Sequence, residues 1–371
     1  MSKKLVLAGG GHAHMMILAE LANIIADGHQ VTVIQPSDHH YYSGMGPGML
    51  STYYSADDIR FNTRFVVERQ GGLFVRDKVT RIEADSQTVV TENGTSIAYD
   101  VLSCNLGSFV PFEHIEGGRE RIFTAKPIER LLEAQRKIIE LADTGRISIC
   151  VVGGGPAAVE IAGNCHHLAA ARGSKDIDIH LLAGKKMMAG YSDAIGRIIR
   201  KTFDSRGVAI DESGYATTIV DGSVILDNDK SFSADIIFVA TGVKPSRVFA
   251  ESGLATGADG GLLVDRFLRC PDHHNIFGGG DCISYSPSPL DKVGVYAVRQ
   301  NPVLLHNVKA ALNGTELQQF DPGGNYLLIF NLGEKYGALQ KGPFVWGGKS
   351  SFFIKDYIDR KFMRRFQTLE E

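Results

Sequence analysis

The chain has 371 residues, which is long enough for two domains and an appended segment. A formal net charge of -3 at pH 7 offers no general attraction for polyanions, so we expect no nucleic-acid partner. The five cysteines lack C-x-x-C and metal-ligand spacing, which favours a reducing compartment, structural thiols and no metal site. They are Cys104, Cys150, Cys165, Cys270 and Cys282.

The N-terminus superficially resembles a secretory signal, because a short polar stretch precedes apolar residues. Residues 9–14 interrupt the apolar run too early for a signal peptide. No uninterrupted apolar stretch approaches the ~20 residues of a membrane-spanning helix. We therefore expect a cytoplasmic protein that is free in solution or peripheral on the inner face of the membrane.

Residues 3–35 predict a strand, a glycine turn, a helix and a second strand. Residues 4–8 are a short apolar run that stops at Gly9, Gly10 and Gly11, and residues 15–25 carry apolar side chains at helical spacing. Glycines in such a turn let the backbone approach a pyrophosphate, and the following helix offers unpaired N–H groups. The turn therefore predicts a dinucleotide site.

This first fingerprint departs from the usual G-x-G-x-x-G pattern. His14 stands where a third glycine usually permits close helix packing, and Gln35 stands where an acid usually binds the adenosine ribose. Glutamine can still bond a hydroxyl. The context favours a role in lining or packing the pocket, rather than metal binding, for His12 and His14.

Residues 149–158 repeat the strand and glycine turn, and residues 177–182 supply the next strand. Two such units predict two different dinucleotides, a bound flavin and a diffusing nicotinamide nucleotide, held so that a hydride can pass between them. The plain alternative is a pair of glycine turns in an ordinary α/β sheet. We expect an α/β fold with two Rossmann-like domains, a discontinuous FAD-binding domain and an NAD(P)-binding domain, followed by a short C-terminal α+β segment.

Residues 41–50 are rich in glycine, methionine and tyrosine and follow the second strand directly. A loop in this position lies at the carboxyl edge of the sheet, where ligands of doubly wound folds bind. We interpret it as facing the flavin through Ser43, Gly44 and Met45, with a plain connecting loop as the alternative.

The chain then resembles the flavoprotein disulfide reductase superfamily, which binds two dinucleotides. In that superfamily, the strands at which the chain passes between the flavin and nicotinamide domains usually end in Ala-Thr-Gly. Here the first such strand ends in Asn105-Leu106-Gly107, and the second, at residues 240–242, ends in the usual Ala-Thr-Gly. The resemblance implies an FAD-binding domain in two parts, 1–112 and 246–312, around an NAD(P)-binding domain, 113–245, with a C-terminal segment, 313–371.

The same resemblance assigns roles in the nicotinamide domain. Glu160 matches the glutamate of the G-G-G-x-x-G-x-E signature, which lies near the nicotinamide in relatives, and Ala158 replaces the third glycine. The end of the following strand lacks the acid that prefers NADH. Lys185 and Lys186 at this position favour NADPH, because they could bind its 2′-phosphate. The alternative is that they are a solvated charge pair in a domain that binds the nicotinamide nucleotide weakly or not at all.

Residues 275–282 resemble the returning flavin segment, in which the Asp of Gly-Asp bonds the ribityl chain. We carry that role to Asp281. A helix begins near Lys292, and its first N–H groups can face the flavin pyrimidine, where they would stabilise negative charge.

The last segment is aromatic and basic. Ile354, Ile358, Phe362 and Phe366 form an i+4 row with basic residues around it. Residues 351–366 could therefore lie in a membrane interface. Because Lys361 and Arg365 interrupt the apolar face, the alternative is docking onto the chain's own flavin domain or onto a second subunit of a homodimer.

Nearly the whole chain resembles type II NADH dehydrogenase-like flavoproteins, and most closely the branch found alone or fused to selenide, water dikinase. The residues that carry this resemblance include residues 5–14, 42–48, 126–128, 294–300 and 355–366. No cysteine occurs in residues 39–54 or 129–145, where disulfide reductases keep their redox pair, and none follows Cys282, which disfavours sulfide:quinone oxidoreductase activity.

We therefore expect an FAD-dependent NAD(P)H oxidoreductase with a quinone-like or other non-disulfide acceptor. The alternatives are a flavin-binding partner module in selenium or sulfur metabolism and a sulfide:quinone oxidoreductase-like enzyme. Glu160 and Lys126 are the catalytic candidates, although a solvent-exposed linker lysine is the plainer interpretation of Lys126. The cofactor-binding candidates are Gly9, Gly11, His12, Ala13, Gln35, Ser43, Gly44, Met45, Val79, Asn105, Gly107, Gly153, Gly155, Pro156, Ala157, Lys185, Gly280, Asp281, Tyr296 and Ala297.

Overall fold

The first of two large sheets forms around the N-terminal strand. The structure, a computed structural model, describes residues 1–112, 114–143, 145–174 and 176–371. All neighbours in this sheet are parallel, and its central strands are apolar and buried. The strand order is β22 (Ile276–Gly278), β9 (Val101–Cys104), β1 (Lys4–Ala8), β2 (Gln30–Gln35) and β5 (Leu73–Arg76).

The helix expected over residues 15–25 is divided into α1 (Met15–Ala19) and α2 (Leu21–Ala26). The side-chain amide of Gln70, which follows α4 (Thr63–Arg69), explains the break. It donates to the carbonyl of Leu18 at 2.7 Å and accepts from the N–H of Ala22 at 3.1 Å. These are the two groups that a continuous helix would join, so a side chain inserted from outside interrupts the ladder.

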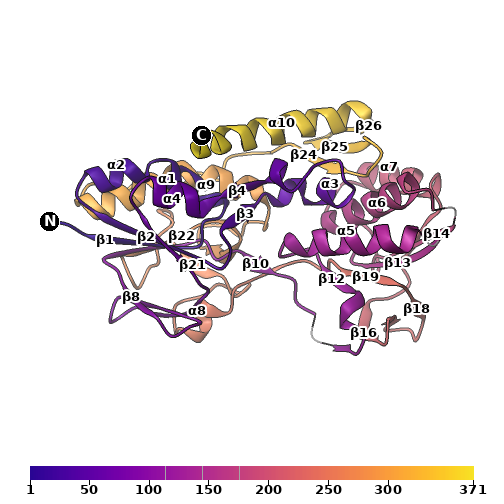
Figure 1. Cartoon of the computed structure of the whole chain (residues 1–371), viewed down its shortest axis with the longest axis horizontal. Helices are drawn as coiled ribbons and strands as arrows, with labels where there is room; N and C mark the ends of the chain where they lie inside the picture. The colour runs from indigo at the N-terminus through magenta and orange to yellow at the C-terminus, as the bar shows by residue number, and fades with distance from the viewer. Residues whose placement is uncertain (113, 144, 175) are drawn as a thin grey trace.

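The second large sheet has the same parallel architecture, which confirms the expected α/β fold with two Rossmann-like units. Helices α5 (Glu129–Ala142), α6 (Pro156–Ala171) and α7 (Asp193–Asp204) accompany it. Its strand order is β12 (Ile122–Thr124), β19 (Ile236–Val239), β13 (Arg146–Val152), β14 (Asp176–Leu182) and β15 (Val208–Asp211). Figure 1 shows the two sheets at opposite ends of the longest axis.

The chain passes between the two sheets at β10 (Ser108–Phe109) and β20 (Lys244–Pro245), which pair in antiparallel orientation. Each large sheet has a smaller companion sheet. The first is antiparallel and comprises β6 (Val79–Glu83), β7 (Thr88–Thr91) and β8 (Ser96–Ala98). In the second, β11 (Ile115–Glu116) pairs in parallel with β16 (Ala216–Val220), and β17 (Ser223–Leu226) and β18 (Ser231–Ser233) continue the sheet in antiparallel orientation. Residue 113, where the expected domain boundary falls, lies outside the described residues, and the division into domains stays a prediction.

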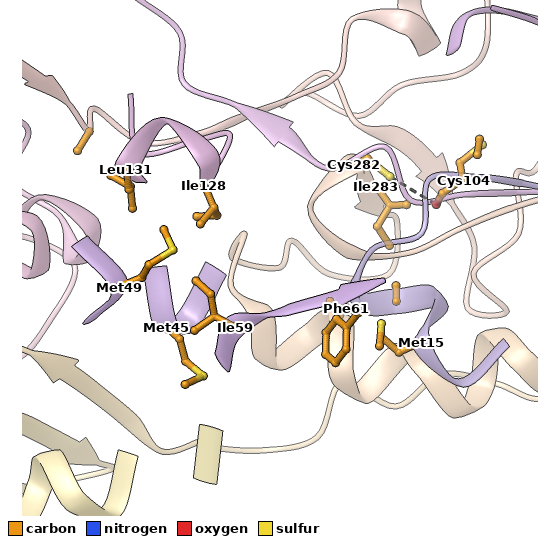
Figure 2. Packing of buried hydrophobic residues seen from close by; sticks show 14 of the residues in the cluster. Met15, Met45, Met49, Ile59, Phe61, Cys104, Ile128, Leu131, Cys282 and Ile283 are labelled. Carbon is orange, nitrogen blue, oxygen red and sulfur yellow. Dashed lines mark hydrogen bonds between the residues drawn. The ribbon is translucent and has the colours of Figure 1, made fainter. Parts of the chain in front are cut away.

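The glycine-rich stretch at residues 41–50 is only partly a loop, because it contains the helix α3 (Gly46–Leu50) after β3 (His39–Tyr41). Pro47 lies in the first turn of this helix, a position that suits its fixed φ. A Cβ on Gly46 would lie 3.2 Å from side-chain atoms of Ile128 and Leu131, so the glycine allows close packing against the start of α5. Figure 2 shows Met49 in this contact, pointing toward Leu131 and Ile128.

The C-terminal segment forms a three-stranded antiparallel sheet and a long helix. The strands are β24 (Leu328–Asn331), β25 (Gly337–Lys341) and β26 (Phe344–Gly348), followed by α10 (Lys349–Gln367). Helix α10, yellow in Figure 1, lies across the molecule above β3, β4 (Arg60–Asn62) and α3. The structure therefore contains one of the expected arrangements, in which the C-terminal helix packs on flavin-side elements of its own chain.

The i+4 row predicted along α10 does not form a single apolar face. Phe366 is 4% exposed and packs inward, whereas Ile354 and Ile358 are each 44% exposed. The inward face instead contains the charged residue Asp359, which is buried. In the described part of the chain, none of the helices combines the length and the apolar character needed to cross a membrane.

Candidate functional site

A cavity of about 1670 Å³ lies between the two large sheets and beneath α10. Ligand sites for one small molecule usually occupy ~300–1,000 Å³, so this volume exceeds what one ligand needs. The cavity brings together most of the predicted site residues at the carboxyl ends of the strands. Those that line it are Gly9, Gly11, His12, Gln35, Ser43, Gly44, Val79, Asn105, Gly107, Lys126, Gly153, Gly155, Pro156, Ala157, Glu160, Gly280, Asp281 and Ala297.

Four predicted cofactor-binding residues do not form part of this cavity wall. Ala13 and Met45 are buried in the core, at 0% and 1% exposure. Tyr296 lines a small neighbouring hollow beside Gly280 and Asp281. Lys185 is exposed beside the cavity, with its ammonium group 3.3 Å from the carbonyl oxygen of Ser213.

The first glycine turn is shaped by close backbone contacts. Gly9 has a φ of +93°, and a Cβ there would lie 2.2 Å from the carbonyl oxygen of Asn105. The side chain of Gln35 accepts from the N–H of Gly10 at 3.1 Å and donates to two carbonyls of the following loop. Gln35 therefore braces the turn, and its predicted bond to a ribose hydroxyl stays a prediction.

His14, at the position of the third glycine, is fully buried and has a packing role. Its Nε2 atom lies 2.8 Å from the hydroxyl of Ser103 on β9, and Nδ1 contacts the carbonyl oxygen of Gly9. Burial lowers the pKa of His14 to about 4, so the ring is neutral at pH 7. The imidazole thus ties the helix to the sheet where a glycine would allow direct contact.

Two polar atoms in the cavity wall fit a ligand rich in hydrogen-bonding oxygens, as FAD is. His12 Nε2 and Asn105 Nδ2 are buried, and neither has a hydrogen-bond partner among the described residues. Buried polar groups are nearly always paired, so these atoms indicate a bound group. With the glycine turn beside them, the residues present fit the dinucleotide of a flavin.

The second glycine turn, residues 153–155, precedes α6, a helix of 16 residues. Gly153 has a φ of +137°, and a Cβ there would lie 2.3 Å from the carbonyl oxygen of Ala240. A Cβ on Gly155, in contrast, would meet no atom within 4 Å, although the residue lines the cavity. The turn is thus closed toward the sheet and open toward the cavity, as a cradle for phosphates requires.

Lys126 and Asp281 form an ion pair inside the cavity wall. Lys126 Nζ donates to Asp281 Oδ2 at 2.5 Å and to the hydroxyl of Ser108 at 2.8 Å, and Ser108 donates to the same carboxylate oxygen at 2.9 Å. Burial opposes ionisation of Asp281, but the charge of Lys126 and these bonds hold its pKa below the ordinary value. The interpretation of Lys126 as a solvent-exposed linker lysine is therefore wrong: its side chain is 25% exposed and turned inward toward Asp281.

Glu160 reaches the cavity from α6 and accepts a hydrogen bond from the N–H of Asn331 at 2.7 Å. Burial raises its pKa to about 7, against the opposing charge of Lys355. The carboxyl group is therefore partly protonated at neutral pH.

Helix α10 contributes a charged cluster to the cavity that sequence reasoning missed. Lys355 Nζ donates to Asp359 Oδ2 and to the carbonyl oxygen of Gly44, both at 2.8 Å, and the hydroxyl of Tyr42 donates to Asp359 at 3.0 Å. Burial opposes the charge of Lys355, but Asp359 and Glu160 raise its pKa above the ordinary value. The only signal in the sequence was the i, i+4 spacing of Lys355 and Asp359, which is typical of an ion pair on a helix.

The cysteines take no part in this site. All five are buried, and none is among the described residues that line the cavity. Burial raises the pKa of Cys150 and of Cys282 to about 12, so both thiols are protonated at neutral pH. Their positions agree with the structural role expected from the sequence.

Comparison with known proteins gives the chain a family and relatives. The pyridine nucleotide-disulphide oxidoreductase family matches residues 3–307. The NADH dehydrogenase-like protein YutJ of Bacillus subtilis is 23% identical, over 90% of this chain and 91% of that protein. A type II NADH:quinone oxidoreductase of Staphylococcus aureus is 26% identical, over 97% of this chain and 94% of that protein.

Solved structures share the fold. NDH2 from Plasmodium falciparum in complex with NADH superposes with a TM-score of 0.80 at 15% identity, covering 99% of this chain and 97% of that one. The sulfide:quinone oxidoreductase of Aquifex aeolicus gives a TM-score of 0.79 at 20% identity, covering 99% and 92%. The closer resemblance to the selenide, water dikinase branch stays a prediction.

Proposed function

Because the chain belongs to the pyridine nucleotide-disulphide oxidoreductase family, we propose that it is an FAD-dependent oxidoreductase that takes electrons from NADH or NADPH and gives them to a quinone-like acceptor. One observation carries the proposal: a single cavity joins both glycine turns and a polar cluster from α10, with no cysteine among its described lining residues. Relatives named for NADH dehydrogenase and NADH:quinone oxidoreductase activity support it.

The chain's residues would hold the two dinucleotides within one cavity. The turn at residues 9–11 and the Lys126–Asp281 pair belong to the flavin side, and the turn at residues 153–155 belongs to the nicotinamide side. When bound, FAD accepts a hydride and passes the electrons on. Helix α9 (Gly294–Asn313) begins in the cavity wall, where its first N–H groups favour negative charge.

We assign the acceptor to the part of the cavity beneath α10, where apolar side chains lie beside a proton-bearing group. Ile358 and Phe362 line it from α10, beside Lys355. Reduction of a quinone consumes protons, and the carboxyl of Glu160 holds one near neutral pH because its pKa is raised to about 7. Glu160 is therefore our candidate for holding and delivering a proton to the acceptor.

A preference for NADPH would rest on Lys185. The side chain of Lys186 is already paired with Asp193 at 2.9 Å, whereas Lys185 contacts only a carbonyl and an aromatic ring among the described interactions. Arginine or lysine at this strand end can meet a 2′-phosphate. We therefore assign any selection for NADPH to Lys185 alone.

We place the protein in the cytoplasm, at the inner face of the membrane, through the outer face of α10 and the adjoining strand. Large apolar side chains there are about half exposed, and Arg364 and Arg365 are on the same helix. Such a surface favours an anionic membrane interface. The exposed apolar residues are Phe344, Trp346, Phe353, Ile354, Tyr357 and Ile358. A homodimer that covers the same face is the competing arrangement.

The test of the proposed function is an anaerobic absorbance titration of the purified protein with NADH and then NADPH, followed by a soluble quinone. We expect one nucleotide to bleach the flavin band and the quinone to restore it. A flavin band that neither nucleotide bleaches would contradict the proposal and favour a partner module that binds flavin without nicotinamide chemistry.

A further inference from the structure

Tyr215 is a large aromatic residue at the nicotinamide end of the cavity that the site described so far does not use. Its side chain lines the cavity and the residue is 57% exposed. It directly precedes β16, at the end of a loop that begins after β15. An aromatic ring left half exposed in a cavity wall offers a flat surface to a ligand.

Hydrogen bonds and a β-bridge hold the backbone at Tyr215 in place. The N–H of Tyr215 donates to Asp227 Oδ1 at 3.1 Å, and the N–H of Asp227 donates to the carbonyl oxygen of Tyr215 at 2.8 Å. The preceding residue, Gly214, pairs in a β-bridge with Gly184 at the end of β14. The backbone of Tyr215 is therefore held next to the end of β14, where its ring reaches Gly184.

The ring packs directly on Gly184. A Cβ on Gly184 would lie 2.5 Å from Tyr215 Cε1, and the φ of +74° at Gly184 also suits glycine. The ammonium group of Lys185 lies 6.0 Å from the centre of the Tyr215 ring, within the usual range of a cation–π contact. Gly184, Lys185 and Tyr215 thus form one surface at the end of β14.

The geometry of the second glycine turn points to the part of the nucleotide that reaches this surface. A pyrophosphate held at Gly155 and the start of α6 leaves the adenosine ribose at the carboxyl end of the next strand, β14. The base lies beyond the ribose. We infer that Tyr215 is the residue on which the adenine of the nicotinamide nucleotide stacks, with Lys185 at the edge of the same surface.

This inference takes only one thing from the proposed function, namely that the ligand is a nicotinamide nucleotide. Stacking on an aromatic side chain tightens the binding of a base by roughly tenfold to a hundredfold. Because the ring touches the adenine end, its loss should weaken binding of the whole nucleotide without changing the reacting end. Tyr215 would be a positioning residue, and the KM should rise while kcat stays near its original value.

The test uses the FAD-loaded full chain and titration calorimetry with ADP-ribose, which carries the adenine but no nicotinamide. We expect Tyr215→Ala to raise the Kd for ADP-ribose about tenfold, and Tyr215→Phe, which keeps the ring, to bind within about twofold of the wild type. Phe65→Ala is the matched control, because Phe65 is a 42% exposed aromatic residue on α4 that does not line the cavity.

The outcomes separate this inference from the proposed function. Unchanged ADP-ribose binding in Tyr215→Ala, or an equal loss in Tyr215→Phe, would overturn the inference. Binding that depends on the Tyr215 ring, in a protein whose flavin neither nucleotide reduces, would support the inference and contradict the proposed function. A wild-type protein that does not bind ADP-ribose at all would overturn both.

Discussion

Lys126 Nζ lies 2.5 Å from Asp281 Oδ2, although the two residues are 155 positions apart in the chain. Lys126 follows β12 in the second large sheet, and Asp281 follows β22 in the first. The ion pair therefore joins the two halves of the molecule at the wall of the cavity. The binding of any group that contacts Asp281 therefore depends on the relative position of the two sheets.

Asp281→Ala should yield protein that purifies largely without flavin. The substitution removes a carboxylate from the cavity wall and leaves Lys126 without its anionic partner. Hydrogen bonds to charged groups contribute roughly 1.5–3 kcal/mol, so flavin binding should weaken about tenfold to a hundredfold. Flavin content after purification, read from the absorbance spectrum, measures the effect.

Asp265→Ala is the matched control for that substitution. Asp265 pairs with Arg269 at 3.3 Å and does not line the cavity, so its loss should lower stability without releasing flavin. Full flavin occupancy in Asp281→Ala would remove the ribityl assignment.

Glu160→Gln should change how stability depends on pH. The pKa of Glu160 is raised from 4.5 to about 7 by burial, so the folded state binds the proton more tightly than the unfolded state. The stability from this proton is present in full below pH 4.5 and is lost as the pH rises through about 7. The shift corresponds to roughly 3 kcal/mol.

Urea unfolding at pH 4.5 and pH 8 measures this effect. Glutamine mimics the protonated carboxyl, so the wild type should lose stability relative to Glu160→Gln between these two pH values. If the difference in free energy of unfolding between the wild type and Glu160→Gln is the same at both pH values, Glu160 titrates near its ordinary pKa. It then holds no proton for an acceptor at neutral pH.

Lys185→Ala should raise the KM for NADPH about tenfold more than the KM for NADH, because it removes the cation available to a 2′-phosphate. Lys186→Ala is the control, since Lys186 is already paired with Asp193. Steady-state kinetics with both nucleotides measure the difference. Equal changes for the two nucleotides would leave Lys185 as a surface charge.

Replacing Phe353, Ile354 and Tyr357 together by serine should reduce sedimentation with anionic liposomes at least tenfold while flavin stays bound. These side chains are 44–64% exposed, and each apolar side chain buried in the interface contributes ~1 kcal/mol or more. Deleting α10 is a poorer test, because the helix also supplies Lys355 and Asp359 to the cavity.

Phe65→Ser, an exposed aromatic change on α4, is the control for the liposome experiment and should bind as the wild type does. Unchanged liposome binding in the triple variant would contradict the membrane proposal. A triple variant that instead turns a dimer into a monomer on gel filtration would assign the same face to a second copy of the chain.

The sequence by itself determined the two strand-turn-helix units, because glycine turns and apolar periodicity are local patterns that constrain the backbone where they occur. The strand Lys4–Ala8 has the bounds of the apolar run from which it was predicted. The lack of a cysteine pair near the turns was equally readable, because it depends only on composition.

Only the tertiary structure decided which distant side chains meet. Nothing near Gln70 predicts that its amide interrupts the first helix, and nothing near Lys126 predicts that it turns inward to Asp281. Lys355 and Asp359 enter the cavity because α10 lies across both halves of the molecule. Such contacts depend on how whole elements pack, and that packing is the sum of many small interactions along the chain rather than the property of any one segment.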